Sequence, residues 1–409
     1  MTLHKGKTEI PSAREVFTDA TTDNSAEAPV PVTLLTGFLG SGKTTLLSRL
    51  VRDQSMARAA IIINEFGEIG IDQLLVTKPK EDMVVLSNGC LCCAVRGELA
   101  DTLALMWRER ASANVPPFDK VVIETSGLAD PTSIMLTVTS DEDISRRYVL
   151  DGVLTVVDSV QSLAQMDEHP EAVRQIIVAD RILLTKNDIA EDGIVKKLCR
   201  RIARLNPMAT LHNVEHGKIE PQLLFNVHPD GRTDSPEKVA EWLRLEEGEK
   251  ACGHPYECDC HSDHDHHGRD SHAGCGHDHR HFGAAHSHDI QSYSMFYEGP
   301  VTPDGLQVWM DAIARLRGPD MLRIKGLINV EGLPVVIQAV QHLFHPPVEL
   351  KEWPDNERRS RFVFITRGIG RDEIEATFSA LSLHSGKDTG FMLDPQGYER
   401  FAKAMTAAL

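Results

Sequence analysis

The first half of the chain alternates short apolar runs with amphipathic stretches. The apolar runs, which are rich in β-branched residues, lie at Val32–Thr36, Ala60–Ile63, Met83–Leu86, Val121–Glu124, Gly152–Val157 and Arg181–Thr185. Between them, apolar residues recur at helical spacing, as in Leu99, Leu103, Met106 and Trp107, and later in Ile194, Leu198, Ile202 and Leu205. This alternation predicts an α/β fold, with a parallel sheet covered by helices on both faces.

A second region with regular patterns begins near residue 291. We expect strands at Ser292–Tyr297, Met321–Val330, Val335–His342 and Phe362–Thr366, and helices at Asp304–Leu316 and near Asp372–Leu381. Such an order predicts a small α+β domain, one sheet with helices on one side.

The remaining segments are polar. Residues 1–31 are acidic and lack the apolar core of a signal peptide, so we expect a disordered leader. Residues 249–290 contain most of the 19 His and few aliphatic residues, which predicts a His/Cys-rich flexible linker. The expected domains are therefore an α/β domain at 32–248 and an α+β domain at 291–385, followed by a helical tail at 386–409.

The net charge and the cysteine content limit the classes of partner and the cellular compartment that we expect for this protein. The chain has 43 Lys+Arg and 60 Asp+Glu, a net charge of −17, which argues against nucleic acid or an anionic membrane as a partner. No stretch approaches the ~20 apolar residues of a membrane span, and we expect a cytoplasmic protein. In a reducing compartment the 8 Cys are expected to be ligands or core residues, and Cys199, beside Leu198 in a helix, to be a packing residue.

The segment from Gly37 to Thr44 matches the P-loop pattern and lies between the first strand and a helix-forming stretch. In this arrangement backbone N–H groups wrap the phosphates, and the helix directs its N-terminus at them. We expect Lys43 to reach the β- and γ-phosphates and the Thr44 hydroxyl to ligate Mg²⁺. The expected phosphate-binding residues are Gly37, Gly40, Ser41, Gly42, Lys43, Thr44 and Thr45.

Two later motifs extend this site. Glu124-Thr-Ser-Gly127 is similar to the Asp-x-x-Gly of GTPases, with Glu124 supporting Mg²⁺ or its water and the Gly127 N–H sensing the γ-phosphate. With Lys43 and Thr44, these two residues form the expected catalytic set. The second motif is Thr185-Lys186-Asn187-Asp188. Its Asp188 can accept two hydrogen bonds from the edge of guanine, and its Lys186 can lie along the face of the ring. This pattern favours GTP over the alternative, ATP. Thr185 stands where this motif commonly has Asn.

The segment Cys90-Leu91-Cys92-Cys93 places three thiols within four residues. Soft thiolates select Zn²⁺ or Cu(I) over Mg²⁺ or Ca²⁺. Zinc prefers four ligands, so a three-thiol set leaves a fourth position for water, Glu65, a His or a partner's ligand. Glu65 and Glu68 could ligate either Mg²⁺ or the transition metal, and the alternative is an acidic strand end with a turn glycine. The alternative for the thiols is packing or redox chemistry. The His-rich linker is expected to be a weak metal collector or a solvated tether.

Together these motifs resemble the CobW-type GTPases, the family that includes the zinc-regulated GTPase metalloprotein activators. The matching segments, in order, are Gly37–Thr44, Asn64–Glu68, Cys90–Cys93, Glu124–Pro131, Thr185–Asp188, a His-rich insert and Arg323–Gly326.

The resemblance implies that Cys90, Cys92 and Cys93 hold zinc, that GTP binding and a slow hydrolysis gate its release, and that a client apo-metalloprotein accepts it. The alternatives are Co²⁺ insertion for cobalamin synthesis or nitrile hydratase activation, and a nucleotide-modulated zinc store or sensor. The client, the oligomeric state and the residue that orients the attacking water are not evident from the sequence.

Overall fold

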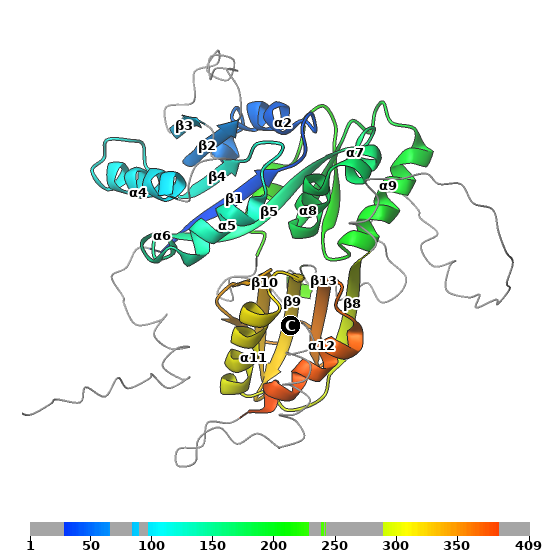
Figure 1. Cartoon of the computed structure of the whole chain (residues 1–409). Coiled ribbons are helices and arrows are strands. Elements are labelled where there is room, and N and C mark those ends of the chain that lie inside the picture. Colours follow the sequence, from blue (N-terminus) through cyan, green and yellow to red (C-terminus); the bar gives the residue numbers. More distant parts are fainter. Residues whose placement is uncertain are drawn as a thin grey trace, which may run out of the picture.

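The computed structural model describes residues 28–65, 84–89, 97–228, 239–240, 242 and 289–383. An α/β domain and a smaller α+β domain follow one another along this part of the chain (Figure 1). The expected tail, nearly all of the expected linker and residues 1–27 of the expected leader lie outside the described residues.

The α/β domain is built on a parallel sheet. In the described residues its strands are β1 (Val30–Thr36), β2 (Ala59–Glu65), β3 (Val84–Gly89), β4 (Lys120–Glu124), β5 (Tyr148–Asp158), β6 (Arg181–Thr185) and β7 (Thr210–Val214). Their order is β3-β2-β4-β1-β5-β6-β7, and every neighbouring pair is parallel. Strand β7, at the edge of this sheet, was not predicted because its two apolar residues, Leu211 and Val214, are separated by two polar ones and show no strand periodicity.

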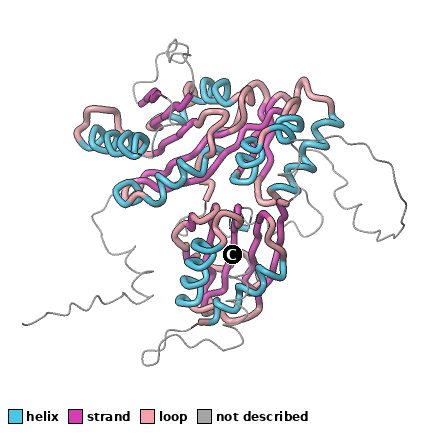
Figure 2. Tube along the Cα trace, in the orientation of Figure 1, coloured by secondary structure: helices cyan, strands magenta, loops and turns pink. Residues whose placement is uncertain are grey.

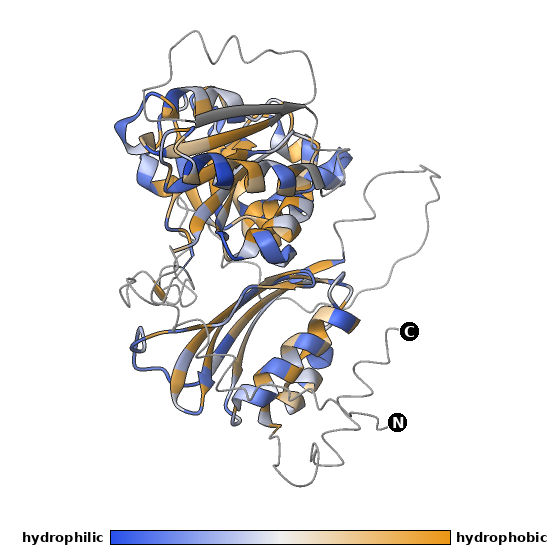
Figure 3. Ribbon diagram, turned by 90° about the vertical axis from the view of Figure 1, so that its left-hand side faces the viewer, coloured by the Kyte–Doolittle hydropathy of each residue, from blue (hydrophilic) through white to orange (hydrophobic). Residues whose placement is uncertain are grey.

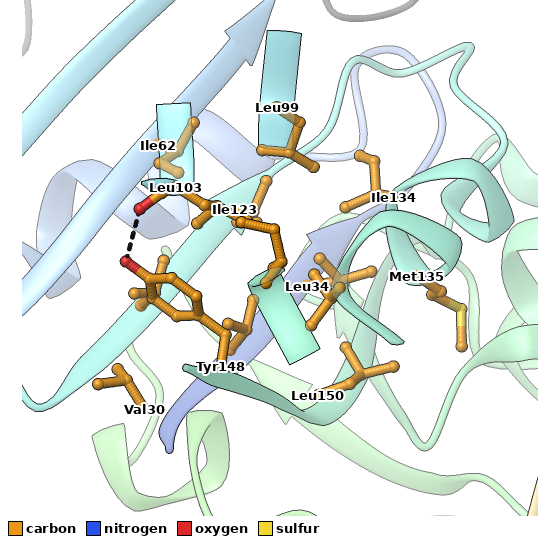
Figure 4. Packing of buried hydrophobic residues seen from close by; sticks show 14 of the residues in the cluster. Val30, Leu34, Ile62, Leu99, Leu103, Ile123, Ile134, Met135, Tyr148 and Leu150 are labelled. Carbon is orange, nitrogen blue, oxygen red and sulfur yellow. Dashed lines mark hydrogen bonds between the residues drawn. The ribbon is translucent and has the colours of Figure 1, made fainter. Parts of the chain in front are cut away.

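Helices cover both faces of this sheet, as predicted (Figure 2). They are α2 (Lys43–Leu50), α4 (Gly97–Ala111), α5 (Pro131–Ser140), α6 (Glu142–Ser145), α7 (Ser162–Glu168), α8 (Pro170–Val178) and α9 (Asp192–Leu205), with short 3₁₀ turns η2 (Gln54–Met56) and η3 (Pro221–Leu224). Helix α2 packs on one face. On the other, Leu99 and Leu103 of α4 and Ile134 of α5 pack against the strands, and the Tyr148 hydroxyl donates to Leu103 O at 2.9 Å (Figure 4).

The α+β domain contains an antiparallel sheet of order β11-β10-β9-β13-β8. Its elements are β8 (Ile290–Tyr297), α11 (Pro303–Leu316), β9 (Met321–Val330), β10 (Leu333–Val340), β11 (Leu343–Phe344), β12 (Val348–Glu349), β13 (Ser360–Arg367), α12 (Arg371–Thr377) and the 3₁₀ turn η5 (Phe378–Ser382). The helices pack around Trp309 on one side of the sheet, as predicted. Strand β10 ends before the predicted His342 because Gln341 adopts a positive φ of 54°.

The strands of both sheets are rich in apolar residues (Figure 3), and most of these residues are buried. The face of the second sheet away from its helices meets the α/β domain through buried charges. Arg323 Nη1 donates to Val178 O at 2.6 Å, and its guanidinium also pairs with Asp180. Lys325 Nζ and His228 Nε2 lie 3.3 and 2.9 Å from the same carboxylate. A buried ion-pair network therefore joins the two domains.

Candidate nucleotide-binding site

The expected nucleotide residues gather at the carboxyl edge of the parallel sheet. The chain runs from β1 to strands on one side and then crosses to β5 on the other, so the strand order reverses at β1. Open α/β sheets bind ligands in the crevice outside such a switch point. The P-loop leaves the sheet at this position.

The P-loop backbone requires its glycines. Gly37 has φ 143°, and a Cβ added there would lie 2.3 Å from Val156 O. Gly42, with φ 100°, precedes the first residue of α2 and gives that helix no side-chain cap, so the N–H groups of its first turn are suited to an anion. The Lys43 ammonium is buried inside the loop and donates to Gly37 O at 2.7 Å and to Phe38 O at 3.2 Å. Thr45 is exposed in the same turn.

A hydroxyl and a carboxylate meet beside the loop. Glu124 ends β4, is 1% exposed, and pairs in register with Leu35 of β1. Its Oε1 accepts a hydrogen bond of 3.0 Å from Thr44 Oγ1. Oxygen donors of these two kinds are those Mg²⁺ prefers, so the residues present fit that ion.

The segment after β4 lies directly on the P-loop. A Cβ added to Gly127 would be 2.6 Å from Leu39 Cδ2 and 2.7 Å from Leu39 N. Beneath this segment, the buried Gln175 of α8 donates from Nε2 to Gly127 O and to Ala129 O, both at 3.1 Å. The sequence analysis missed Gln175. Its one signal is a polar residue among the apolar, buried positions of α8.

At the other end of the loop, Thr185 and Lys186 join the P-loop to the neighbouring strands. Thr185 Oγ1 donates to Ser41 O at 2.7 Å, so the hydroxyl that replaces the common Asn holds the loop. Lys186, with φ 60°, donates to Gly40 O at 3.0 Å and to Asp158 Oδ2 at 2.6 Å. Asp158, the buried last residue of β5, was also missed by the sequence analysis.

The Asp188 carboxylate is 40% exposed and lies where β6 and β7 end. His216, in the turn after β7, has Nδ1 3.9 Å from Asp188 Oδ2. Next to it, Asn187 Nδ2 donates to Asn213 Oδ1 at 2.8 Å. The structure thus brings Lys43, Thr44, Glu124, Gly127, Lys186 and Asp188 to one edge of the sheet.

Most of the expected metal ligands, Cys90, Cys92, Cys93 and Glu68, lie outside the described residues. Glu65 ends β2 and pairs in register with Gly89, the last residue of β3, so Cys90 follows directly. Within the described ranges, no group of three His, Cys, Asp or Glu could hold a metal ion. Cys199 is buried among apolar residues, and burial raises the pKa of its thiol to about 11, as fits a packing residue.

The fold and loop geometry define a P-loop nucleotide-binding protein. Residues 31–213 match the family model of the CobW/HypB/UreG nucleotide-binding domain, and residues 290–382 match that of the cobalamin synthesis protein cobW C-terminal domain. The chain belongs to the CobW family. In the described residues, no helix is long and apolar enough to cross a membrane.

Two relatives and one solved structure extend over both domains. The zinc chaperone YjiA of Escherichia coli (strain K12) is 34% identical over 355 residues, covering 86% of this chain and 99% of that protein. The zinc chaperone CobW of Sinorhizobium sp is 29% identical, covering 78% of this chain and 88% of that protein. The crystal structure of Zn(II)-bound YjiA GTPase from E. coli has a TM-score of 0.59 at 30% identity, covering 87% of this chain and 99% of that one.

Proposed function

We propose that this protein is a GTP-hydrolysing zinc metallochaperone. It binds GTP and Mg²⁺ at the P-loop and passes zinc from Cys90, Cys92 and Cys93 to a client apo-metalloprotein. The names of the full-length relatives and the Zn(II)-bound YjiA structure support zinc as the cargo. A further relative supports a client: the zinc-regulated GTPase metalloprotein activator 1 of Schizosaccharomyces pombe is 32% identical over 200 residues, 47% of each chain.

The nucleotide site supports GTP hydrolysis through distinct roles. Lys43 and the first turn of α2 hold the phosphates, and Asp188 reads the guanine edge while the Lys186 stem lies along the ring. Thr44 and Glu124 hold Mg²⁺, which supplies positive charge where negative charge develops on the phosphate. The Gly127 N–H detects the γ-phosphate, and Gln175 fixes the segment that presents it.

The register of the sheet carries the proposal that nucleotide and metal are coupled. Glu124 of β4 lies beside Ile63 of β2, and two residues further Glu65 lies beside Gly89 of β3. Cys90 is the next residue along the chain. Only strand β2 therefore separates Glu124, at the proposed Mg²⁺ position, from the end of β3, where the thiol segment begins.

The decisive measurement is the zinc affinity of the full chain without nucleotide, with a GTP analogue and with GDP, against a competing chelator. We expect a shift of tenfold or more between nucleotide states, which is about 1.4 kcal/mol of coupling. Three coincident curves would contradict nucleotide gating. The same titration with Co²⁺ separates the cargoes, because a tighter, nucleotide-dependent Co²⁺ site would replace zinc in the proposal.

Two triple variants locate the gated site. Changing Cys90, Cys92 and Cys93 to Ser is expected to remove the nucleotide-dependent zinc affinity. The matched control changes Cys252, Cys258 and Cys260 to Ser in the His-rich segment and should leave it intact. If the control instead loses the zinc and the first variant keeps it, the protein is a store that uses its His-rich segment.

A further inference from the structure

A pocket of about 920 Å³ lies between α7, α8 and α9 and the sheet of the α+β domain. Met166, Val173, Ile177 and Leu322 contribute apolar side chains to its lining. Its volume is at the upper end of the ~300–1,000 Å³ typical of ligand sites, which occur preferentially at domain interfaces. None of the proposed nucleotide or zinc residues lines it.

The pocket is basic although the chain is acidic, with a net charge of −17. Its rim contains two carboxylates, Asp167 and Glu168, against six cations, Arg174, Lys197, Arg200, Arg201, Arg204 and Arg367. Three of these cations have acidic partners at 2.6 to 3.9 Å: Arg201 pairs with Asp167, Arg174 with Glu171 and Arg367 with Asp320.

The other three form a row on α9. Lys197, Arg200 and Arg204 are exposed, and within the described part of the chain none forms an ion pair. Their spacing of three and four residues puts them on one side of the helix over about 10 Å. A single anionic head group can pair with one of them. An acidic peptide with carboxylates at similar spacing can pair with all three.

The pocket also contacts elements of the nucleotide site. Thr132, whose N–H donates to Asp130 Oδ1 at 3.0 Å, follows the Gly127 segment and lines the pocket. Val173 and Ile177 of α8 line it as well, and Gln175 of the same helix holds Gly127 O and Ala129 O. An occupant would therefore touch two elements that position the γ-phosphate sensor.

We propose that this pocket is the docking site for an acidic segment of a partner protein, with carboxylates along Lys197, Arg200 and Arg204 and apolar side chains on the pocket floor. Identifying that partner as the client rests on the proposed function. Docking is measured without zinc and without GTP hydrolysis. A failure of docking can therefore be distinguished from a failure of zinc transfer.

The probe is a fluorescein-labelled helical peptide of about 14 residues, or about 21 Å, with Glu and Leu on adjacent faces. Its anisotropy is measured with the full chain in GDP at low salt. We expect saturable binding that weakens with added salt, and at least tenfold weaker binding when all Glu become Gln or all Leu become Gln.

Two protein variants with the same change in net charge complete the test. The combined Lys197→Glu, Arg200→Glu and Arg204→Glu variant is expected to bind the peptide at least tenfold more weakly. The control changes Lys196, Arg52 and Arg108 to Glu, which are exposed and outside the pocket, and is expected to bind it as the unchanged protein does. Equal melting temperatures and GTP hydrolysis rates would show that both variants fold.

Three outcomes would overturn the proposal. The first is equal peptide binding by the two variants. The second is equal binding of an oligothymidylate with the same charge, which would make the pocket a general polyanion site. The third is at least tenfold tighter binding after deletion of residues 1–27, which would make the chain's own acidic leader the occupant.

Discussion

At the scale of single residues, the Thr44 hydroxyl is the smallest group on which the proposed chemistry depends. It donates to Glu124 Oε1 at 3.0 Å, and the carboxylate that accepts this hydrogen bond is buried. Thr44→Val keeps the shape and removes the oxygen. We expect GTP hydrolysis to fall on the order of 10²-fold and the Mg²⁺ dependence of nucleotide binding to disappear. The control, Thr139→Val on α5, removes a hydroxyl that donates to Met135 O of its own helix, and it should hydrolyse GTP within a few-fold of the unchanged protein. Equal losses in the two variants would contradict the assignment.

The base preference also depends on one side chain. A carboxylate at position 188 accepts from guanine N1 and N2, whereas an amide can accept from N1 and donate to the 2-oxygen of xanthine. We therefore expect Asp188→Asn to lower the affinity for GTP at least tenfold and to raise the affinity for xanthosine triphosphate. Competition with a labelled nucleotide measures both affinities. Unchanged GTP affinity would mean that Asp188 does not read the base.

At the scale of secondary-structure elements, α8 connects the nucleotide site to the rest of the molecule. Gln175→Leu removes the donor that holds two buried carbonyls, so we expect a loss of about 1–3 kcal/mol in unfolding free energy. We also expect slower GTP hydrolysis, because the Gly127 segment loses its support. Denaturant titration and a hydrolysis assay check the two effects. Gln307→Leu, the same change on the exposed face of α11, should alter neither.

The same elements show what the sequence could predict. The P-loop was predictable because its glycines and its Lys-Thr pair act within eight consecutive residues. Gln175 was not, because the two carbonyls that it holds lie 48 and 46 residues earlier in the sequence. The ion pair of Asp158 with Lys186 was not, because it joins the ends of two neighbouring strands that are far apart in the sequence. Strand β7 was missed, and His216 with it, because an edge strand carries a weak apolar signal.

At the scale of the whole molecule, Asp180 holds the two domains together. Burial alone would raise the pKa of this carboxyl, but the charges of Arg323, His228 and Lys325 hold it well below its usual value. Asp180→Asn removes the charge that pairs with all three of these side chains, and we expect a loss of about 3–5 kcal/mol in unfolding free energy. Asp320→Asn removes an exposed pair with Arg367 and should lose less than about 1 kcal/mol. Similar losses in the two variants would contradict this role.

Low pH should also reduce the unfolding free energy through a buried histidine at this interface. Burial, followed by the charges of His228 and Arg323, lowers the pKa of His345 from 6.5 to about 3. Between pH 6.5 and 3 the His345 imidazole therefore binds a proton in the unfolded chain but stays neutral in the folded chain. The unfolding free energy is at its full value above pH 6.5, and it decreases as the pH falls toward 3. Between these values we expect His345→Gln to reduce the slope of unfolding free energy against pH by up to about 1.4 kcal/mol per unit. The exposed His342→Gln variant should keep the original slope.

The contacts that fix the two domains have a consequence for the length of the sequence between them. The Lys325 ammonium lies 4.5 Å from the centre of the Trp242 ring, and Gly368 N donates to Asp289 O at 2.9 Å, so the two described residues that flank 243–288 each have contacts of their own. The free energy of closing a loop rises only with the logarithm of its length, by about 0.6 kcal/mol for each doubling. Descendants of this gene can therefore gain or lose histidines and cysteines there by insertion and deletion, while the domain arrangement stays unchanged.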